Sequence, residues 1–364
     1  MDMIKKFRIP MSKPDFGDDE RNALLEVFDS GWLSQGKVTK QFEDDLAQYL
    51  SSNCAVVNNG SSALICALLA HGIKPGDKIA VPAFTFIATA TSAKILGAEI
   101  IPVDIDPNTL NINAEELENL VKRSQIKAVI VVDVGGLPID IEIFSELAKK
   151  YNFILIEDAA ESLGSEFKKK KIGSFDHITT FSFHMAKPIT TIEGGCIVSK
   201  NEKIIKKIEQ IRNHGRASNE KYVHSVLGTN FRITDLQSAL GIQQLKKIEK
   251  FIDGRNKVAS RYRKEIENVQ FQEIPNFVSK HAYMLFFGIV DSANKKDEIL
   301  KKCITNGIDC RNAWMPISKQ QCFPELKNIK CPNAEKIFEQ SFTIPIYNSI
   351  SDADVDYIIN TINK

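Results

Sequence analysis

The sequence predicts an α/β protein with a mainly parallel sheet in a large domain and a smaller α+β domain after it. Short, nearly continuous apolar runs are typical of strands buried on both faces. Helical patterns separate several of these runs, and the character of the chain changes after about residue 235. A chain of 364 residues also exceeds what a single core usually supports. We therefore expect a large domain over residues 1–245 and a small domain over residues 246–364.

Two helices are expected before the first strand. The first covers residues 18–30, and its inward-facing side chains are predicted to be Leu24, Leu25, Val27 and Phe28. The second is indicated by apolar residues at helical spacing, which are Phe42, Leu46, Tyr49 and Leu50.

Seven apolar runs then predict the strands of the large sheet. They cover residues 54–57, 78–82, 98–104, 127–133, 153–158, 179–184 and 195–199. Helical patterns at residues 61–71 and 141–151 lie between some of them. Strand, helix and strand in succession favour parallel pairing.

The last third of the chain begins with a long charged helix. Leu245, Ile248 and Ile252 mark it, and it is expected to run towards Ile266 and to join the two domains. Short mixed elements follow it to the end of the chain.

Bulk properties exclude several classes of function. The formal net charge is +1, which gives no electrostatic basis for binding nucleic acid or an anionic membrane. The seven cysteines form no CxxC pair, so a zinc site or disulfide framework is disfavoured and a reducing cytoplasm fits. The opening MDMIKKFRIP lacks the apolar stretch of a signal peptide, and no apolar run approaches membrane-spanning length.

Ligands of open α/β sheets bind where strands end, so the residues that follow each strand are candidates for a site. Asn-Asn-Gly-Ser-Ser at residues 58–62 opens a helix, where free N–H groups suit a phosphate; an ordinary N-cap explains it equally well. Asp158 ends a strand and suits a cation or a protonated ring nitrogen, although a helix N-cap is the simpler explanation for an isolated aspartate.

Lys187 follows the sixth strand, and Pro188 restricts its backbone towards an extended conformation. A lysine held there can form a Schiff base, although an isolated lysine is more often a surface residue. A phosphate seat, an acid and a lysine in this order are the three groups that pyridoxal phosphate requires. The combination therefore favours this cofactor more strongly than any one motif does.

Motifs along nearly the whole chain resemble the DegT/DnrJ/EryC1/StrS family of nucleotide-sugar aminotransferases, which has the aspartate-aminotransferase (type I) fold. They are GWLSQGKVTKQFE, NNGSSAL, PAFTFIATA, EDAAESLGS, SFHMAKPITTIEGG, NHGR, GTNFRITDLQSALGIQQL, HAYMLF and FTIPIYNSISDADVDYII. The combination is specific, whereas each motif alone is not.

The resemblance implies roles for individual residues. Lys187 matches the catalytic lysine that forms the Schiff base with pyridoxal phosphate, and Asp158 matches the acid that pairs with the pyridine nitrogen. The positions that match the phosphate-binding set are Gly60, Ser61, Ser62 and Ser182.

Three further positions follow from the same resemblance. Phe86 matches the aromatic side chain that stacks on the cofactor ring, against the alternative of a core phenylalanine. Glu161 lies where the family has Gln, His or Glu near the phenolic oxygen. Asn230 matches an asparagine that reaches the phosphate from the other subunit, which implies a homodimer with composite active sites.

The resemblance also implies a reaction that needs no metal. An amino group moves from an amino acid, usually glutamate, through the cofactor to a keto-sugar linked to a nucleotide. His184, Thr190, Thr191 and Glu193 fit the family members that aminate C4. We therefore expect a cytoplasmic enzyme that aminates a nucleotide-linked 4-keto-6-deoxyhexose for surface polysaccharide or glycan biosynthesis, such as O-antigen. Uridine, guanosine and thymidine fit equally well as the base.

Amination at C3, or of an N-acetylated or cyclitol substrate, is the closest alternative. A non-catalytic cofactor-binding regulator is disfavoured because Lys187 is present, and the same residue argues against the family's dehydratase branch, where histidine replaces it. A P-loop over residues 31–37 fails because Val38 stands where Ser or Thr must hold magnesium. The family usually has Pro-Leu-His where this chain has Pro316, Ile317 and Ser318, so the role of that histidine is in doubt.

Overall fold

The computed structural model describes residues 7–217 and 222–364. Residues 1–6 lie outside the described residues. They are part of the opening stretch in which the sequence predicts no signal peptide. In the described part of the chain, no helix combines the length and the apolar character needed to cross a membrane.

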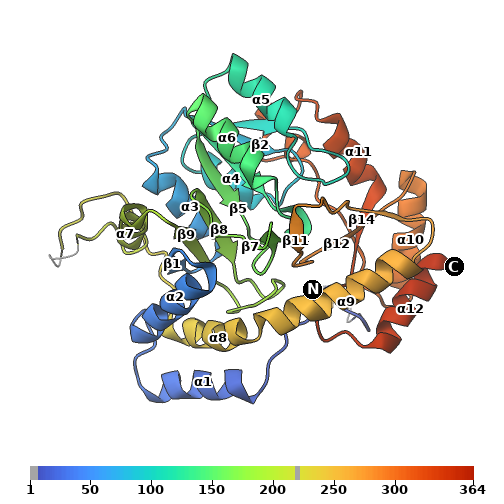
Figure 1. The fold of residues 1–364 in the computed structure, drawn as a ribbon, viewed down its shortest axis with the longest axis horizontal. Helices are drawn as coiled ribbons and strands as arrows, with labels where there is room; N and C mark the ends of the chain where they lie inside the picture. Colours follow the sequence, from blue (N-terminus) through green and yellow to red (C-terminus); the bar gives the residue numbers. More distant parts are fainter. Residues whose placement is uncertain (1–6, 218–221) are drawn as a thin grey trace.

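A seven-stranded sheet forms the centre of the larger part of the molecule (Figure 1). Its strand order is β1-β9-β8-β5-β4-β2-β3, and only β9 runs antiparallel to its neighbours. The bounds are β1 (Asn53–Val57), β2 (Lys78–Pro82), β3 (Glu99–Val103), β4 (Ala128–Val132), β5 (Ile154–Asp158), β8 (Ile178–Ser182) and β9 (Gly195–Ser199). The expected mainly parallel sheet is therefore confirmed.

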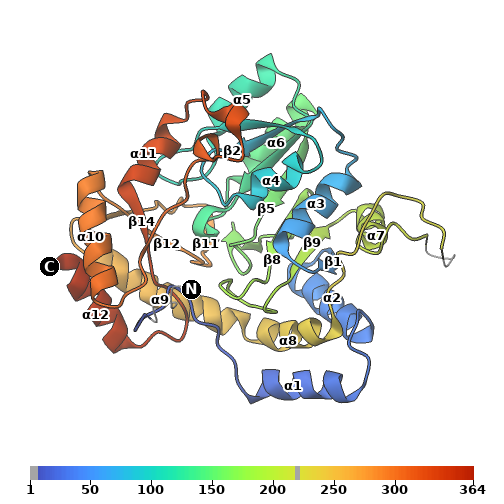
Figure 2. The same cartoon turned by 180° about the vertical axis from the view of Figure 1, so that it is seen from behind.

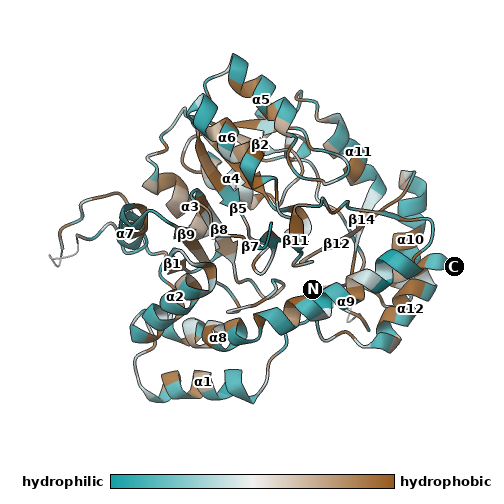
Figure 3. Ribbon diagram, in the orientation of Figure 1, coloured by the Kyte–Doolittle hydropathy of each residue, from teal (hydrophilic) through white to brown (hydrophobic). Residues whose placement is uncertain are grey.

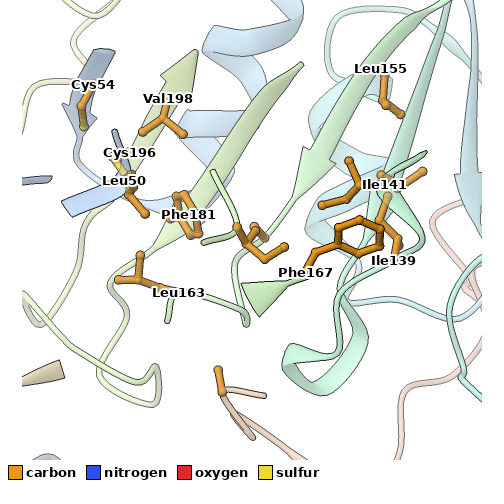
Figure 4. Close-up of a cluster of buried hydrophobic side chains, with 14 of the residues drawn as sticks. Leu50, Cys54, Ile139, Ile141, Leu155, Leu163, Phe167, Phe181, Cys196 and Val198 are labelled. Atoms are coloured by element: carbon orange, nitrogen blue, oxygen red, sulfur yellow. The ribbon is translucent and has the colours of Figure 1, made fainter. Parts of the chain in front are cut away.

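Helices cover both faces of this sheet. Alternate residues of β4 enter two different cores: Val129 and Val131 pack in one, Ala128 and Ile130 in the other. The first core (Figure 4) also takes side chains from α2 (Lys37–Leu50), α5 (Ala114–Arg123) and α6 (Ile141–Tyr151). The second takes them from α3 (Gly60–Ala70), α4 (Ala88–Lys94) and α7 (Glu202–Ile211), and Figure 2 shows α3 and α4 on that side. Burial on both faces explains why the strands are almost wholly apolar.

The C-terminal part has its own antiparallel sheet, with strand order β10-β12-β14-β13. Its strands are β10 (Gln270–Phe271), β12 (Phe286–Ile289), β13 (Arg311–Asn312) and β14 (Ser341–Ile344). The helices in this part are α9 (Ile248–Glu265), α10 (Ala293–Thr305), α11 (Pro332–Gln340) and α12 (Asp352–Asn363), with 3₁₀ turns at Ile317–Lys319 and Pro324–Leu326. A third, small sheet joins β11 (Val278–Lys280), β6 (Glu166–Phe167) and β7 (Lys170–Lys171).

The beginning of the chain returns to this C-terminal sheet. Ile9 forms a parallel bridge with Ile308, and its carbonyl accepts a hydrogen bond from the N–H of Asp309 at 2.9 Å. The N–H of Ile346 donates to the carbonyl of Met11. The expected division at residue 245/246 falls beside the junction of α8 (Asp235–Lys246) and α9, and it stays a prediction.

Two local expectations were wrong. The strand expected at residues 179–184 ends at Ser182, because the chain turns there and the N–H of Lys187 donates to the carbonyl of His184. On α1 (Asp18–Asp29), Val27 is buried as expected, but Leu25 is 50% exposed and Phe28 is 63% exposed. The reason is that α1 lies at the edge of the molecule with α8 as its main neighbour, so part of its surface is left uncovered in this chain (Figure 3).

Candidate active site

A cavity of about 750 Å³ lies where the carboxyl ends of the large sheet meet the C-terminal sheet. The end of β5, the end of β8 and the loop after β2 form one wall. Residues of β13, the chain before β12 and the segment that contains Met11 form the other. The cavity brings together seven of the residues expected at the site: Gly60, Ser61, Phe86, Asp158, Glu161, Ser182 and Lys187.

Lys187 lies at this cavity, where its side chain is largely buried. Its Nζ is 3.4 Å from Oε1 of Glu161, and the other oxygen of that carboxylate accepts from the N–H of Gly135 at 2.8 Å. Burial raises the pKa of the Glu161 carboxyl, and the positive charge of Lys187 opposes this rise. The contact with Glu161 keeps the lysine amine at the cavity rather than free in solvent.

Asp158 ends β5 and points into the same cavity. Its Oδ2 accepts from the hydroxyl of Thr89 at 2.8 Å, and its Oδ1 accepts from the N–H of Ala160 at 3.3 Å. Burial is the main cause that raises the pKa of this carboxyl, against the hydrogen bond from Thr89. A cationic partner such as a protonated ring nitrogen would stabilise the ionised form of this buried carboxyl.

The N-terminus of α3 provides the expected seat for an anion. The first N–H groups of a helix have no acceptor within the helix. Asn59 caps the N–H of Ser62 at 2.8 Å, which leaves the N–H groups of Gly60 and Ser61 at the cavity. A Cβ on Gly60 would lie 2.8 Å from Cβ of Ser182, so only glycine allows the two segments to approach this closely.

Phe86 lies in the loop between β2 and α4 and is 56% exposed. The alternative of a core phenylalanine is therefore excluded. An exposed aromatic ring beside this cavity has the position that a ring-stacking residue needs.

Three expected positions lie outside the cavity lining. Ser62 is buried, and its N–H is occupied by Asn59. Asn230 is exposed, and its Oδ1 accepts from the N–H of Arg232. Ser318, at the position of the family's histidine, is buried, and its hydroxyl has no partner within the described residues. Phosphate binding by Ser62 and Asn230 remains a prediction.

The structure adds residues that sequence reasoning missed. Thr89 orients Asp158, and Met11, Arg311 and Trp314 line the cavity. Thr89 lies within the quoted PAFTFIATA motif, which could have identified it. The others come from segments far away in the chain, and no local pattern connects them with the strand ends.

These residues fit pyridoxal phosphate. The open N–H groups of α3 suit its phosphate, buried Asp158 suits its pyridine nitrogen, and Lys187 is the amine to which it attaches. Gly60 and Ser182 lie so close together that only glycine fits at position 60, and this close contact defines the proposed phosphate-binding end of the cavity.

Comparison with known proteins agrees with this fit. The model of the DegT/DnrJ/EryC1/StrS aminotransferase family matches residues 14–363. The UDP-4-amino-4,6-dideoxy-N-acetyl-beta-L-altrosamine transaminase of Campylobacter jejuni serotype O:23/36 is 35% identical, with 97% of this chain and 96% of the relative covered. The GDP-perosamine synthase of Escherichia coli O157:H7 is 33% identical, with 98% of both chains covered.

A solved structure shares the fold as well as the sequence. The PLP form of the putative sugar aminotransferase Spr1654 from Streptococcus pneumoniae superposes with a TM-score of 0.91 at 26% identity. The alignment covers 98% of this chain and 97% of that one. Together with the site, these matches establish that the chain belongs to the DegT/DnrJ/EryC1/StrS aminotransferase family and is a pyridoxal-phosphate-dependent aminotransferase.

Proposed function

We propose that this aminotransferase moves an amino group from L-glutamate to C4 of a nucleotide-linked 4-keto-6-deoxyhexose. The observation that carries the proposal is the loop from Ser182 to Gly194, which places Lys187 and Glu193 at the cavity. This loop contains the His-Met-Ala-Lys and Thr-Thr-Ile-Glu-Gly-Gly pattern of the C4-aminating members. The name of the Campylobacter relative, which contains a UDP-linked 4-amino-4,6-dideoxy sugar, supports the same position.

Pyridoxal phosphate, when bound, supplies an electron sink for the carbon that carries the amino group. The residues of this chain then divide the remaining work. Asp158 keeps a proton on the ring nitrogen by offering a buried carboxylate. The Nζ atom of Lys187 carries the proton to and from the reacting carbon, and Glu161 orients that amine. Gly60 and Ser61 hold the phosphate end in place with their N–H groups.

We also propose a homodimer with each active site at the subunit interface. Asn230 is exposed and lies outside the cavity lining of its own chain, as a residue that acts in the partner's site would. The exposed apolar side chains of α1 and the loop after it offer a surface that association would bury, namely Leu25, Phe28, Trp32 and Leu33.

The seven cysteines are free thiols, which is consistent with the reducing cytoplasm that we propose for this enzyme.

The first test is an absorbance titration of the purified protein with pyridoxal phosphate and then with glutamate. We expect a visible band that glutamate bleaches, that is absent from Lys187→Ala, and that a 4-keto-6-deoxyhexose nucleotide restores. Nucleotide sugars with a 3-keto group form the comparison set, and NMR of the product identifies the aminated carbon. Restoration by 3-keto sugars alone would overturn the C4 assignment. A band that glutamate leaves unchanged would overturn the donor, and a wild type with no band would overturn the role of Lys187.

A further inference from the structure

Arg311 lies on the cavity wall opposite the cofactor residues. It belongs to β13, and its side chain is 63% exposed. Its Nε donates to Oδ1 of Asp309 at 2.9 Å and its Nη2 donates to Oδ2 at 2.7 Å. The carboxylate of Asp309 is itself only 8% exposed. A buried carboxylate thus forms a bidentate ion pair with one edge of a guanidinium that faces an open cavity.

This ion pair leaves another edge of the guanidinium available. Arginine has five N–H donors in a planar fork, and the pair with Asp309 uses the Nε side of it. The edge formed by Nη1 and the second N–H of Nη2 has the spacing that matches a second oxyanion in a two-point contact. An arginine that is prepositioned in this way loses little side-chain entropy when it binds an anion.

The charge balance of the cavity indicates what this edge is for. Among the described residues that line it, Asp158, Glu161 and Glu193 are acidic. Lys187 is basic, but it faces Glu161 and is the attachment point of the cofactor. Arg311 is the remaining permanent cation in that lining. A substrate that carries oxyanions must overcome three nearby carboxylates, so it needs a cation of this kind.

We propose that Arg311 binds an oxyanion of the substrate, either the carboxylate of the amino donor or the diphosphate of the nucleotide sugar, and that Asp309 positions it. The inference rests on the proposed function only for the identity of the two substrates. Donor and acceptor occupy the cavity in turn, so one guanidinium can serve either substrate or both.

Asp309 also fixes the wall around Arg311. Its Oδ2 accepts from the N–H of Met11 at 3.2 Å, and Met11 lines the same cavity as Arg311. The hydroxyl of Thr343 donates to the carbonyl of Arg311 at 3.3 Å. Asp309 therefore joins the start of the chain to β13 and sets the place of both segments.

The test compares Arg311→Ala with Arg261→Ala in single-turnover half-reactions. Arg261 is a matched control because it also pairs with carboxylates, those of Glu265 and Asp356, but does not line the cavity. The first half-reaction titrates glutamate against the cofactor-loaded protein, and the second titrates the keto-sugar nucleotide against the aminated form. We expect Arg311→Ala to raise the half-saturating concentration about 10- to 100-fold in at least one of them.

The half-reaction affected identifies the oxyanion: the first indicates the donor carboxylate, the second the diphosphate, and a loss in both indicates that both bind here in turn. The inference is overturned if both half-saturation values stay within about two-fold of the wild type, or if Arg261→Ala loses as much. If Arg311→Ala loses the cofactor band or fails to fold, Arg311→Lys replaces it; this variant keeps the charge without the fork, and an unchanged half-saturation then overturns the two-point contact. If glutamate does not bleach the absorbance band of the wild-type protein, only the proposed amino donor is contradicted. The half-reactions are then repeated with the amino acid that does bleach the band.

Asp309→Asn tests the positioning role. We expect it to raise the half-saturating concentration of the same substrate, and to add nothing to Arg311→Ala in the double variant, because Asp309 acts through Arg311. A purely structural role would instead lower the unfolding temperature and add its effect to that of Arg311→Ala.

Discussion

The Nζ atom of Lys187 lies 3.4 Å from Oε1 of Glu161, and both side chains are largely withdrawn from water. The pair joins the loop after β8 to the segment after β5, two strands that are neighbours in the sheet. A cation of this kind lowers the cost of a buried carboxylate, and removing it leaves that cost uncompensated.

Lys187→Ala should therefore affect stability as well as activity. In cofactor-free protein, we expect a loss of about 2 kcal/mol in the free energy of unfolding, because Glu161 is then buried without a cation. Without Lys187 the pKa of Glu161 rises further, so the loss is full above this pKa and disappears as the pH falls and the carboxyl takes up a proton. Urea unfolding at acidic and alkaline pH measures the difference.

Lys187→Ala/Glu161→Gln is the control for this prediction. An amide at position 161 needs no cation, so the double variant should recover part of the stability at alkaline pH. A loss in Lys187→Ala that is equal at all pH values, or a double variant less stable than either single one, would contradict the assigned pair.

Asp158→Asn should exchange function for stability. Burial raises the pKa of Asp158 above its ordinary value of 3.8, so the unfolded chain gives up this proton at lower pH than the folded one. The free energy of unfolding falls as the pH rises from the pKa of Asp158 in the unfolded chain to its pKa in the folded chain. At neutral pH the carboxylate is ionised, and its burial destabilises the folded protein by the full amount. The cofactor-free variant should be more stable than the wild type by about 1 kcal/mol at pH 7, and the gain should shrink towards pH 4.

The same variant should bind pyridoxal phosphate more weakly and lose transamination, because an amide holds no negative charge beside the ring nitrogen. Urea unfolding across the pH range and cofactor titration together measure both effects. A stability gain that grows at acidic pH would have the wrong sign for a buried carboxyl.

Gly60→Ala tests the phosphate seat. The added Cβ would meet Cβ of Ser182 at 2.8 Å, so the start of α3 must move away from β8. We expect the dissociation constant of pyridoxal phosphate to rise at least about ten-fold, because the N–H groups no longer converge on the phosphate. Fluorescence titration of the cofactor measures it.

Gly17→Ala is a matched control, since Gly17 also stands at a helix N-terminus. A Cβ there meets nothing closer than 3.7 Å, and its backbone is extended. This variant should change cofactor affinity by less than about two-fold. Equal losses in the two variants would mean that the contact between Gly60 and Ser182 does not shape the seat.

The sequence predicted the residues that follow the strands, and it predicted them because strand ends meet at one edge of a parallel sheet. Gly60, Asp158 and Lys187 all lie at that edge, and each is marked by a local pattern. Local patterns cannot show which distant segment closes the other side. Arg311 reaches the cavity from the C-terminal sheet, and Met11 reaches it because the start of the chain pairs with residues just before β13.

The error on α1 has a related cause. Apolar residues at helical spacing indicate a face that will be covered, but they do not say by which chain. The spacing predicts that Leu25 and Phe28 face inward, and both are exposed in this chain. Within a homodimer, the same pattern would be satisfied by a second copy.

Complementation between inactive variants tests the composite site. Lys187→Ala lacks the attachment lysine, and Asn230→Asp brings a negative charge to the position expected to meet the partner's phosphate. Both should be inactive alone. If Asn230 acts in the partner's site, a mixed dimer has one site with both defects and one site with none. Co-expression of the two differently tagged chains should therefore restore about a quarter of wild-type activity per total protein, since half of the dimers are mixed and half of their sites are intact.

The opposite arrangement predicts a different result. If Asn230 served its own chain, every site of the mixed dimer would carry one defect and no activity would return. Separation of the mixed dimer by its two tags gives the direct measurement, with a specific activity near half of the wild type. Light scattering on each variant provides the control, because Asn230→Asp leaves the exposed apolar side chains of α1 unchanged and should remain a dimer. An Asn230→Asp protein that is fully active alone would remove Asn230 from the phosphate site altogether.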